Sequence, residues 1–206
     1  LTGIAAMVSQ PKGGTWHKRW GYTYYFGMLL VAFSSVLSMA LYDFFFFLFP
    51  IAIFSIHLVY SGFRAIDQGR SGNITRLDWL VAWSTALIGL ALFGYGIYVL
   101  GLSNNIPLTI LSLVFGFFIA LSGYGDIKIY RALARQEPMW WWFHHMRGML
   151  GSYIAAFTAF LVQNGEWLKL GDAQIILWIA PGVIGGFGIG LWSKHYKKKF
   201  EAEKSL

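Results

Sequence analysis

Five histidines are the residues of this sequence best suited to chemistry, because imidazole can ligate a metal or exchange a proton near neutral pH. They are His17, His57, His144, His145 and His195. His57 lies seven residues before Arg64, so on a helix that rises about 1.5 Å per residue it lies about 10 Å inside that charged edge. Tyr60, Ser61 and Arg64 follow it on the same helical face, and this polar stripe must face protein rather than lipid.

A second group of candidate residues follows the three tryptophans at 140–142. If these tryptophans mark the headgroup level of a membrane, His144 and His145 lie up to about one turn deeper, and Arg147 lies deeper again. Their depth is then close to that of His57. Adjacent helical residues point about 100° apart, so only one of the two histidines can face a given cavity.

Three further residues are expected at the same side. Asp126 ends another apolar segment and is the expected partner of Arg147 or Arg64, since an arginine buried in a bilayer normally has an anionic partner. His17 and Arg19 stand at the beginning of an earlier segment, where they can lean over the same cavity.

The first interpretation of these residues is a b-type haem held by two histidines, and it is the cofactor that we consider. His57 would be one axial ligand, and His144 or His145 the other. Arg147 or Arg19 would bind a propionate. Against this interpretation, no predicted span carries two histidines two to four turns apart, a spacing that familiar membrane cytochromes often have. A haem or quinone-linked electron carrier is therefore an alternative function.

Two other interpretations stay open. One is a proton or small-anion pathway, in which imidazoles exchange protons and the arginines hold the anion. The other is structural, an internal hydrogen-bond network or a docking face for another membrane subunit, and it is the favoured one. Neither an HExxH motif nor a carboxylate pair of a metallohydrolase occurs. We therefore expect a non-catalytic, accessory or structural membrane protein.

The composition places these residues in a membrane protein. Of the 206 residues, 57% are hydrophobic, 19% aromatic and 12% charged, whereas a soluble domain carries about 25% charged residues. The mean hydropathy is +0.55. These values exclude a soluble enzyme and a disordered chain. The sequence has no cysteine, which excludes disulfides and thiolate metal sites.

The positions of the charged residues divide the chain into apolar segments, because a charge at the bilayer centre costs roughly 2.5 to 3.5 kcal/mol. Six segments have the roughly 20 residues that a spanning helix needs. Their predicted bounds are 21–42, 44–64, 79–101, 106–126, 143–163 and 173–193. Residues 1–8 are too short to span; we expect the end of a seventh helix, with an interfacial segment or a signal-sequence remnant as alternatives.

The predicted fold is therefore all-α: a single polytopic transmembrane domain over 1–206, with six full helices plus a partial N-terminal helix. Fifteen of its 16 Lys and Arg fall on the side of the C-terminus, and Lys169 alone falls on the other. By the positive-inside rule the C-terminus is cytoplasmic. Since topology explains the net charge of +7, we expect membrane lipid and other membrane subunits as partners, and no nucleic acid.

Small residues recur every four positions in the last two segments. Gly182, Gly186 and Gly190 follow one face of the last segment, and Gly148 and Ser152 one face of the segment before it. Small residues let helix backbones approach closely in lipid. The spacing therefore predicts that these two faces pack together.

Two stretches resemble a known family. The segment from Pro11 to Tyr24, PKGGTWHKRWGYTY, resembles the opening motif of a family of bacterial multi-pass membrane proteins of unknown function, in which Lys-Gly precedes His-basic-Arg and then Gly and Tyr. The stretch at 144–160 resembles a late helix of that family. The resemblance implies an all-helical fold in the bacterial cytoplasmic (inner) membrane. It implies family-type positions at His17, Arg19, His144 and Arg147, and no established reaction.

Overall fold

The protein is built from helices. The computed structural model describes residues 2–9, 11–41, 48–102, 105–137, 139–165 and 174–204. Its elements in chain order are α1 (Thr2–Val8), α2 (Thr15–Leu41), α3 (Leu48–Ser71), α4 (Arg76–Leu102), α5 (Ile106–Arg131), the short 3-10 helix η2 (Leu133–Arg135), α6 (Trp140–Gln163) and α7 (Ile175–Lys204). The predicted all-α class is confirmed.

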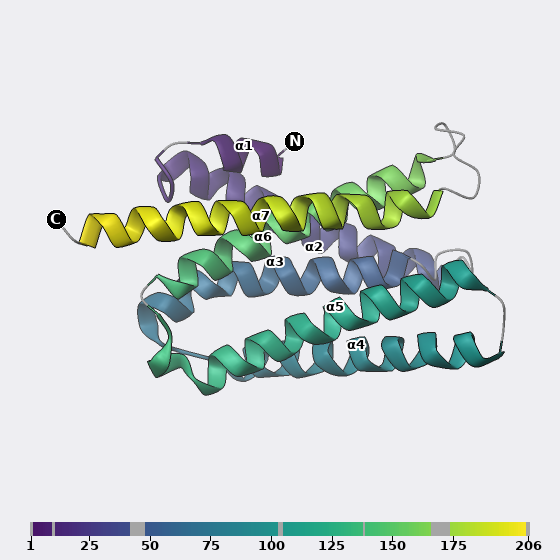
Figure 1. Ribbon diagram of the computed structural model, residues 1–206. Coiled ribbons are helices and arrows are strands. Elements are labelled where there is room, and N and C mark those ends of the chain that lie inside the picture. Colours follow the sequence, from purple (N-terminus) through teal and green to yellow (C-terminus); the bar gives the residue numbers. More distant parts are fainter. Residues whose placement is uncertain are drawn as a thin grey trace.

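The long helices lie lengthwise beside one another (Figure 1). The hairpin of α4 and α5 forms one side, α3 and α6 lie in the middle, and α7 lies on the side opposite the hairpin. The α3–α4 link, the α5–α6 link and the C-terminus lie at the same end, at the left of Figure 1. We call it the basic end; its cations include Arg64, Arg131, Arg135, Lys194 and Lys197.

Four helices of the described residues are long and apolar enough to cross a membrane by length and composition. These are Phe49–Ser71, Arg76–Leu102, Ile106–Arg131 and Ile175–Ala202. The other two predicted segments, 21–42 and 143–163, fall largely in α2 and α6, helices of 27 and 24 residues. Four apolar helices are compatible with the predicted membrane protein.

Several predicted segment ends differ from the observed helix ends. The segment expected to end at 64 continues to Ser71, and the one expected to end at 126 continues to Arg131. A charged residue ends the apolar part of a helix, but it does not interrupt the backbone hydrogen bonds. The polar ends of α3 and α5 thus extend beyond the apolar segment and carry the side chains described below.

Glycines set the closest helix contacts. In the α4–α5 hairpin, a Cβ added to Gly123 would lie 2.5 Å from the backbone nitrogen of Ala86. Between α3 and α6, a Cβ on Gly148 would lie 2.7 Å from Cα of Gly62 and 2.6 Å from the carbonyl oxygen of Leu58. No side chain fits at these positions, so the backbones cross in direct contact.

The contact between the last two helices differs from the predicted one. A Cβ on Gly182, Gly186 or Gly190 would meet nothing within 4 Å, whereas one on Gly185 would meet the side chain of Ile154 in α6. The predicted partner face of α6 is used by other helices, with Gly148 against α3 and Ser152 hydrogen-bonded to Tyr24 of α2. Small residues mark a face that permits close approach, and they do not specify which neighbour occupies it.

Candidate functional site

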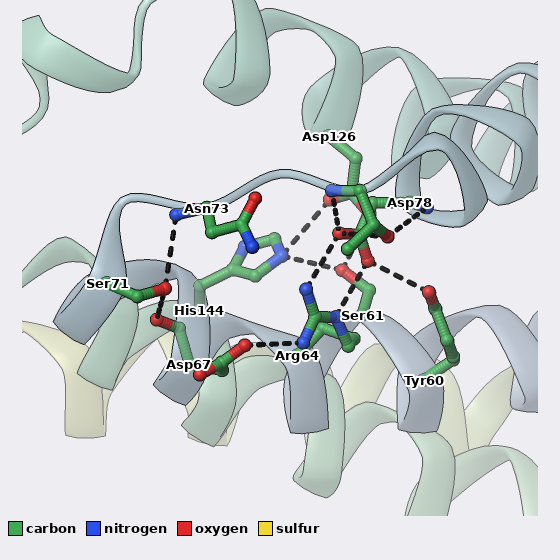
Figure 2. A network of polar contacts seen from close by, with 10 residues as sticks. Tyr60, Ser61, Arg64, Asp67, Ser71, Asn73, Asp78, Asp126 and His144 are labelled. Carbon is green, nitrogen blue, oxygen red and sulfur yellow. Dashed lines mark hydrogen bonds and ion pairs between the residues drawn. The ribbon is translucent and has the colours of Figure 1, made fainter.

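Two polar clusters lie along α3 near the basic end (Figure 2). The first, the Arg64–Asp78 cluster, joins α3 to the start of α4. Arg64 donates from Nε to Oδ1 of Asp78 and from Nη2 to Oδ2, both at 2.9 Å, so the contact is bidentate. The Tyr60 hydroxyl donates to the same Oδ1 at 2.8 Å. Asp67 accepts from Arg64 Nη1 at 2.6 Å.

The local sequence places Asp78 in this cluster. Thr75 stands directly before α4 and Asp78 is the third residue of the helix, which is the spacing of a capping box. The backbone N–H and the hydroxyl of Thr75 donate to Asp78 Oδ2 at 2.8 and 2.9 Å, and the Asp78 N–H donates to Thr75 Oγ1 at 3.2 Å. The fully buried Asp78 carboxylate therefore accepts five hydrogen bonds, so its hydrogen-bonding capacity is fully used.

The second cluster, the His57–Asp126 cluster, joins α3, α5 and α6. The Asp126 carboxylate is buried, and Ser61 donates to its Oδ2 at 2.6 Å. His144 Nε2 lies 3.1 Å from Asp126 Oδ1 and 2.7 Å from Ser61 Oγ. Because Ser61 gives its proton to Asp126, its oxygen accepts from His144, so Nε2 of His144 carries a hydrogen. His57 Nε2 lies 3.6 Å from Asp126 Oδ2.

His57 is one of two buried residues, among those that the structure describes, whose side-chain hydrogen-bonding capacity is unused. Its side chain is 2% exposed, and neither ring nitrogen makes a hydrogen bond of normal geometry within the described part of the protein, although the backbone of Ser122 lies near the ring. A buried polar group left in this state costs about 1 to 3 kcal/mol. A buried imidazole thus faces a carboxylate at a distance slightly longer than a hydrogen bond.

The other predicted histidines lie apart from Asp126. His145 donates from Nδ1 to the carbonyl oxygen of Gly62 at 2.8 Å, and its ring is edge-on to His17 with centroids 6.4 Å apart. His17 donates from Nδ1 to the carbonyl oxygen of Ala6 at 3.0 Å. The two adjacent histidines of α6 therefore contact different partners, and His17 belongs with His145.

The arginine partners differ from the expectation. Asp126 was the expected partner of Arg147 or Arg64, whereas Arg64 pairs with Asp78 and Asp67. Arg147 is exposed and donates from Nε to Ser193 of α7 at 3.5 Å. The Arg19 guanidinium lies 5.5 Å from the centre of the Trp16 ring.

The sequence prediction missed the role of Asp78. Its signal was available in Thr75-Arg76-Leu77-Asp78, a capping-box pattern that marks both the helix start and a carboxylate beside the end of the preceding helix. Gln68 was missed as well. It is 2% exposed, and its amide atoms lack a hydrogen-bond partner in the described part of the chain.

The structure bears on one of the two predicted haem ligand pairs, His57 with His144, whereas the pair of His57 with His145 stays a prediction. The Asp126 carboxylate lies 3.6 Å from Nε2 of His57 and 3.1 Å from Nε2 of His144, in the space where a haem held by these two atoms would have to lie. A macrocycle would have to replace that carboxylate. Among the described residues, no group of three or more His, Asp or Glu is arranged to hold a metal ion.

One further ion pair lies in the link before α6. Lys197 of α7 donates from Nζ to Glu137 Oε2 at 2.9 Å. This hydrogen bond and the positive charge hold the pKa of Glu137 below its usual range. Both side chains are exposed, so water screens the pair.

No protein-family model matches the chain, and no curated protein or solved structure is significantly similar to it. The resemblance of the segment from Pro11 to Tyr24 to a bacterial membrane family therefore stays a prediction, and the proposals below depend on the site itself.

Proposed function

We propose that this chain is a non-catalytic integral membrane protein that binds a proton in the His57–Asp126 cluster. In this proposal six helices span the bacterial cytoplasmic membrane, α1 is the partial helix, and the basic end with the C-terminus faces the cytoplasm. The exposed apolar side chains support the membrane placement. Ile184 and Phe187 of α7, for example, are 72% and 70% exposed, a surface that suits lipid and not water.

The observation that carries the proposal is a buried carboxylate between two imidazoles. His144 hydrogen-bonds to it, and His57 faces it without a hydrogen bond. A proton added to His57 creates an imidazolium beside the Asp126 carboxylate, and closing the 3.6 Å gap would give a charge-assisted hydrogen bond. The site therefore has a place for one more proton without further rearrangement of the helices.

The proton would reach His57 from the basic end. The His144 side chain is 23% exposed and lines a cavity there, so it can exchange a proton with water. Asp126 and Ser61 link His144 to the fully enclosed His57. The route has its opening at His144 and its end at His57, which is the arrangement of a proton-binding site reached from one side.

Nitrogen-15 NMR of the histidine side chains in lipid nanodiscs tests the proposal. As the sample is acidified from about pH 8 to about pH 4, we expect protonation of His57 to change the signals of His57 and His144 together, because both imidazoles face the Asp126 carboxylate. Asp126→Asn should separate the two transitions, and Asp67→Asn, which removes an exposed carboxylate of α3, should leave them coupled. A His57 signal that stays constant over this range, or coupling retained in Asp126→Asn, would contradict the proposal.

An accessory membrane subunit is the second candidate function, favoured by the exposure of α7. Only 6% of the apolar stretch of α7 is buried within the chain, whereas 50% of the apolar stretch of α3 is buried. If a partner helix covers α7, Gly186→Leu should abolish a crosslink from α7 to that partner in native membranes. Gly94→Leu is the matched control, because a Cβ at either glycine meets nothing within 4 Å. Equal crosslinking in wild type and both variants would exclude this contact.

A further inference from the structure

A cavity of about 280 Å³ opens at the basic end between α5, α6 and α7. Three cations line it, Arg147 from α6 and Lys194 and Lys197 from α7. Glu137 is the one acidic residue in its wall, and it pairs with Lys197 at 2.9 Å. Two of the three positive charges therefore have no acidic partner in the cavity wall.

The groups around these cations suit an oxyanion. The one hydrogen bond that the described residues give the Arg147 guanidinium is long, from Nε to Ser193 Oγ at 3.5 Å. Its other N–H groups form the planar fork that binds phosphate in a bidentate way. Ser193 and Gln136 also line the cavity and can donate hydrogen bonds.

The apolar part of the wall restricts where the anion can lie. Ile129, Trp140 and Phe143 form it, and all other lining residues are polar or charged. The volume is near the lower limit of about 300 Å³ for small-molecule pockets. A phosphate group with a short substituent fits such a space, and a large cofactor does not.

We propose that this cavity binds a phosphate group, carried either by a small soluble anion or by the headgroup of an anionic phospholipid. Both sources present the same chemistry to Arg147 and Lys194. The site goes beyond the proposed proton binding and does not depend on it, because none of its three cations belongs to the His57–Asp126 cluster. His144 lines the cavity and also contacts Asp126, so a bound phosphate would lie next to the entrance of the proton route.

Two measurements on the full chain distinguish the sources. In nanodiscs of phosphatidylcholine alone, inorganic phosphate is titrated into the protein by calorimetry. In a parallel sample, the protein is extracted from vesicles of phosphatidylcholine and phosphatidylglycerol, and the retained phosphatidylglycerol is counted by native mass spectrometry. Each measurement compares wild type with Arg147→Gln and with Arg70→Gln. Arg70 is an exposed residue at the end of α3 and does not line the cavity, so its variant removes the same charge elsewhere.

Loss of a charge-assisted hydrogen bond weakens binding by about tenfold or more. We therefore expect Arg147→Gln to weaken phosphate binding, or to reduce phosphatidylglycerol retention, by at least about tenfold, with Arg70→Gln within about twofold of wild type. An effect in the first measurement identifies a soluble anion, and an effect confined to the second identifies a lipid headgroup. Equal behaviour of wild type and Arg147→Gln in both measurements overturns the proposal. Equal losses in Arg147→Gln and Arg70→Gln also overturn it, because they would indicate diffuse attraction to the basic end.

Discussion

Each of the two polar clusters of α3 contains a buried carboxylate, but the two carboxylates differ in their hydrogen-bond partners. In the Arg64–Asp78 cluster, a buried carboxylate accepts five hydrogen bonds, two of them from the residue that caps its own helix. In the His57–Asp126 cluster, a buried carboxylate lies between two imidazoles, and one of these has no hydrogen bond within the described residues. The first cluster therefore fixes the α3–α4 corner, and the second contains the unsatisfied imidazole at which we propose that a proton binds.

The origin of the partners explains this difference. Two of the three residues around Asp78 come from α3, and the third, Thr75, is three residues away in the chain. The partners of Asp126 come from two other helices, α3 and α6, and only helix packing brings them together. The predictions below, ordered from the largest effect to the smallest, test whether the two clusters have these separate roles.

Asp78→Ala should destabilise the protein most. It leaves the half-buried Arg64 guanidinium without its bidentate partner and removes the Asp78 half of the capping box of α4, and breaking a buried ion pair typically costs about 3 to 5 kcal/mol. The free energy of unfolding in mixed micelles measures this loss. Asp67→Ala is the matched control, since Asp67 binds the same arginine but is 59% exposed, and it should cost less than about 1 kcal/mol. Equal losses would show that burial does not distinguish these two partners.

Gly148→Ala should disturb the His57–Asp126 cluster and spare the Arg64–Asp78 cluster. The added Cβ would lie 2.6 Å from the carbonyl oxygen of Leu58, so α6 must move away from α3, at a cost of about 1 to 3 kcal/mol. This shift should pull His144 away from Ser61, which histidine NMR would detect. Gly151→Ala is the control on the same helix.

In the control variant, the added Cβ would meet only the end of the Leu58 side chain at 3.2 Å, and that side chain can turn aside. We expect Gly151→Ala to change the free energy of unfolding by much less than Gly148→Ala. If Gly148→Ala leaves the His144 signals unchanged, the close contact of α3 and α6 does not position this histidine.

The same distinction between local and long-range partners explains what the sequence could predict. Apolar segments between charges identified the long helices, because helix formation and burial in lipid depend on composition along the chain. The capping-box residues Thr75 and Asp78 were equally readable. The contact of Ser61 with His144 was not, since it depends on the crossing of α3 and α6 at Gly62 and Gly148.

The glycines of α7 are a second example of a helix contact that the sequence could not predict. Their spacing is similar to that of glycines at close helix contacts, yet a Cβ on Gly186 meets nothing and one on Gly185 meets Ile154. One residue corresponds to about 100° of helix rotation. A sequence gives the spacing of small residues accurately, but the rotation of a helix depends on all its contacts.

Ser61→Ala should have a moderate effect that is confined to the second cluster. The variant removes the hydrogen bond that Ser61 donates to the buried Asp126 carboxylate at 2.6 Å, and such a loss costs about 1 kcal/mol. Unfolding in mixed micelles measures the cost, and the histidine signals should report a changed Asp126. Ser84→Ala is a suitable comparison, because the Ser84 hydroxyl donates only within its own helix, to the carbonyl oxygen of Val81. A larger loss in Ser84→Ala would mean that the bond to Asp126 does not stabilise the fold.

The exposed pair of Glu137 and Lys197 should give the smallest effect, and it separates the influence of a partner from that of burial. Lys197 lowers the pKa of Glu137 in the folded protein, so the pair contributes stability above the pKa of the unfolded chain and loses it as the pH falls through the lower folded pKa. Carboxyl carbon-13 NMR should show the Glu137 pKa rising toward its usual range in Lys197→Gln and staying low in Lys199→Gln, which leaves this ion pair intact.

Water screens this pair on all sides, so the loss of Lys197 should leave the free energy of unfolding almost unchanged. If Lys197→Gln instead destabilises the protein as strongly as Asp78→Ala, then charge pairing alone, without burial, holds the helices at the basic end, and the contrast between the two clusters of α3 would have to be explained without burial.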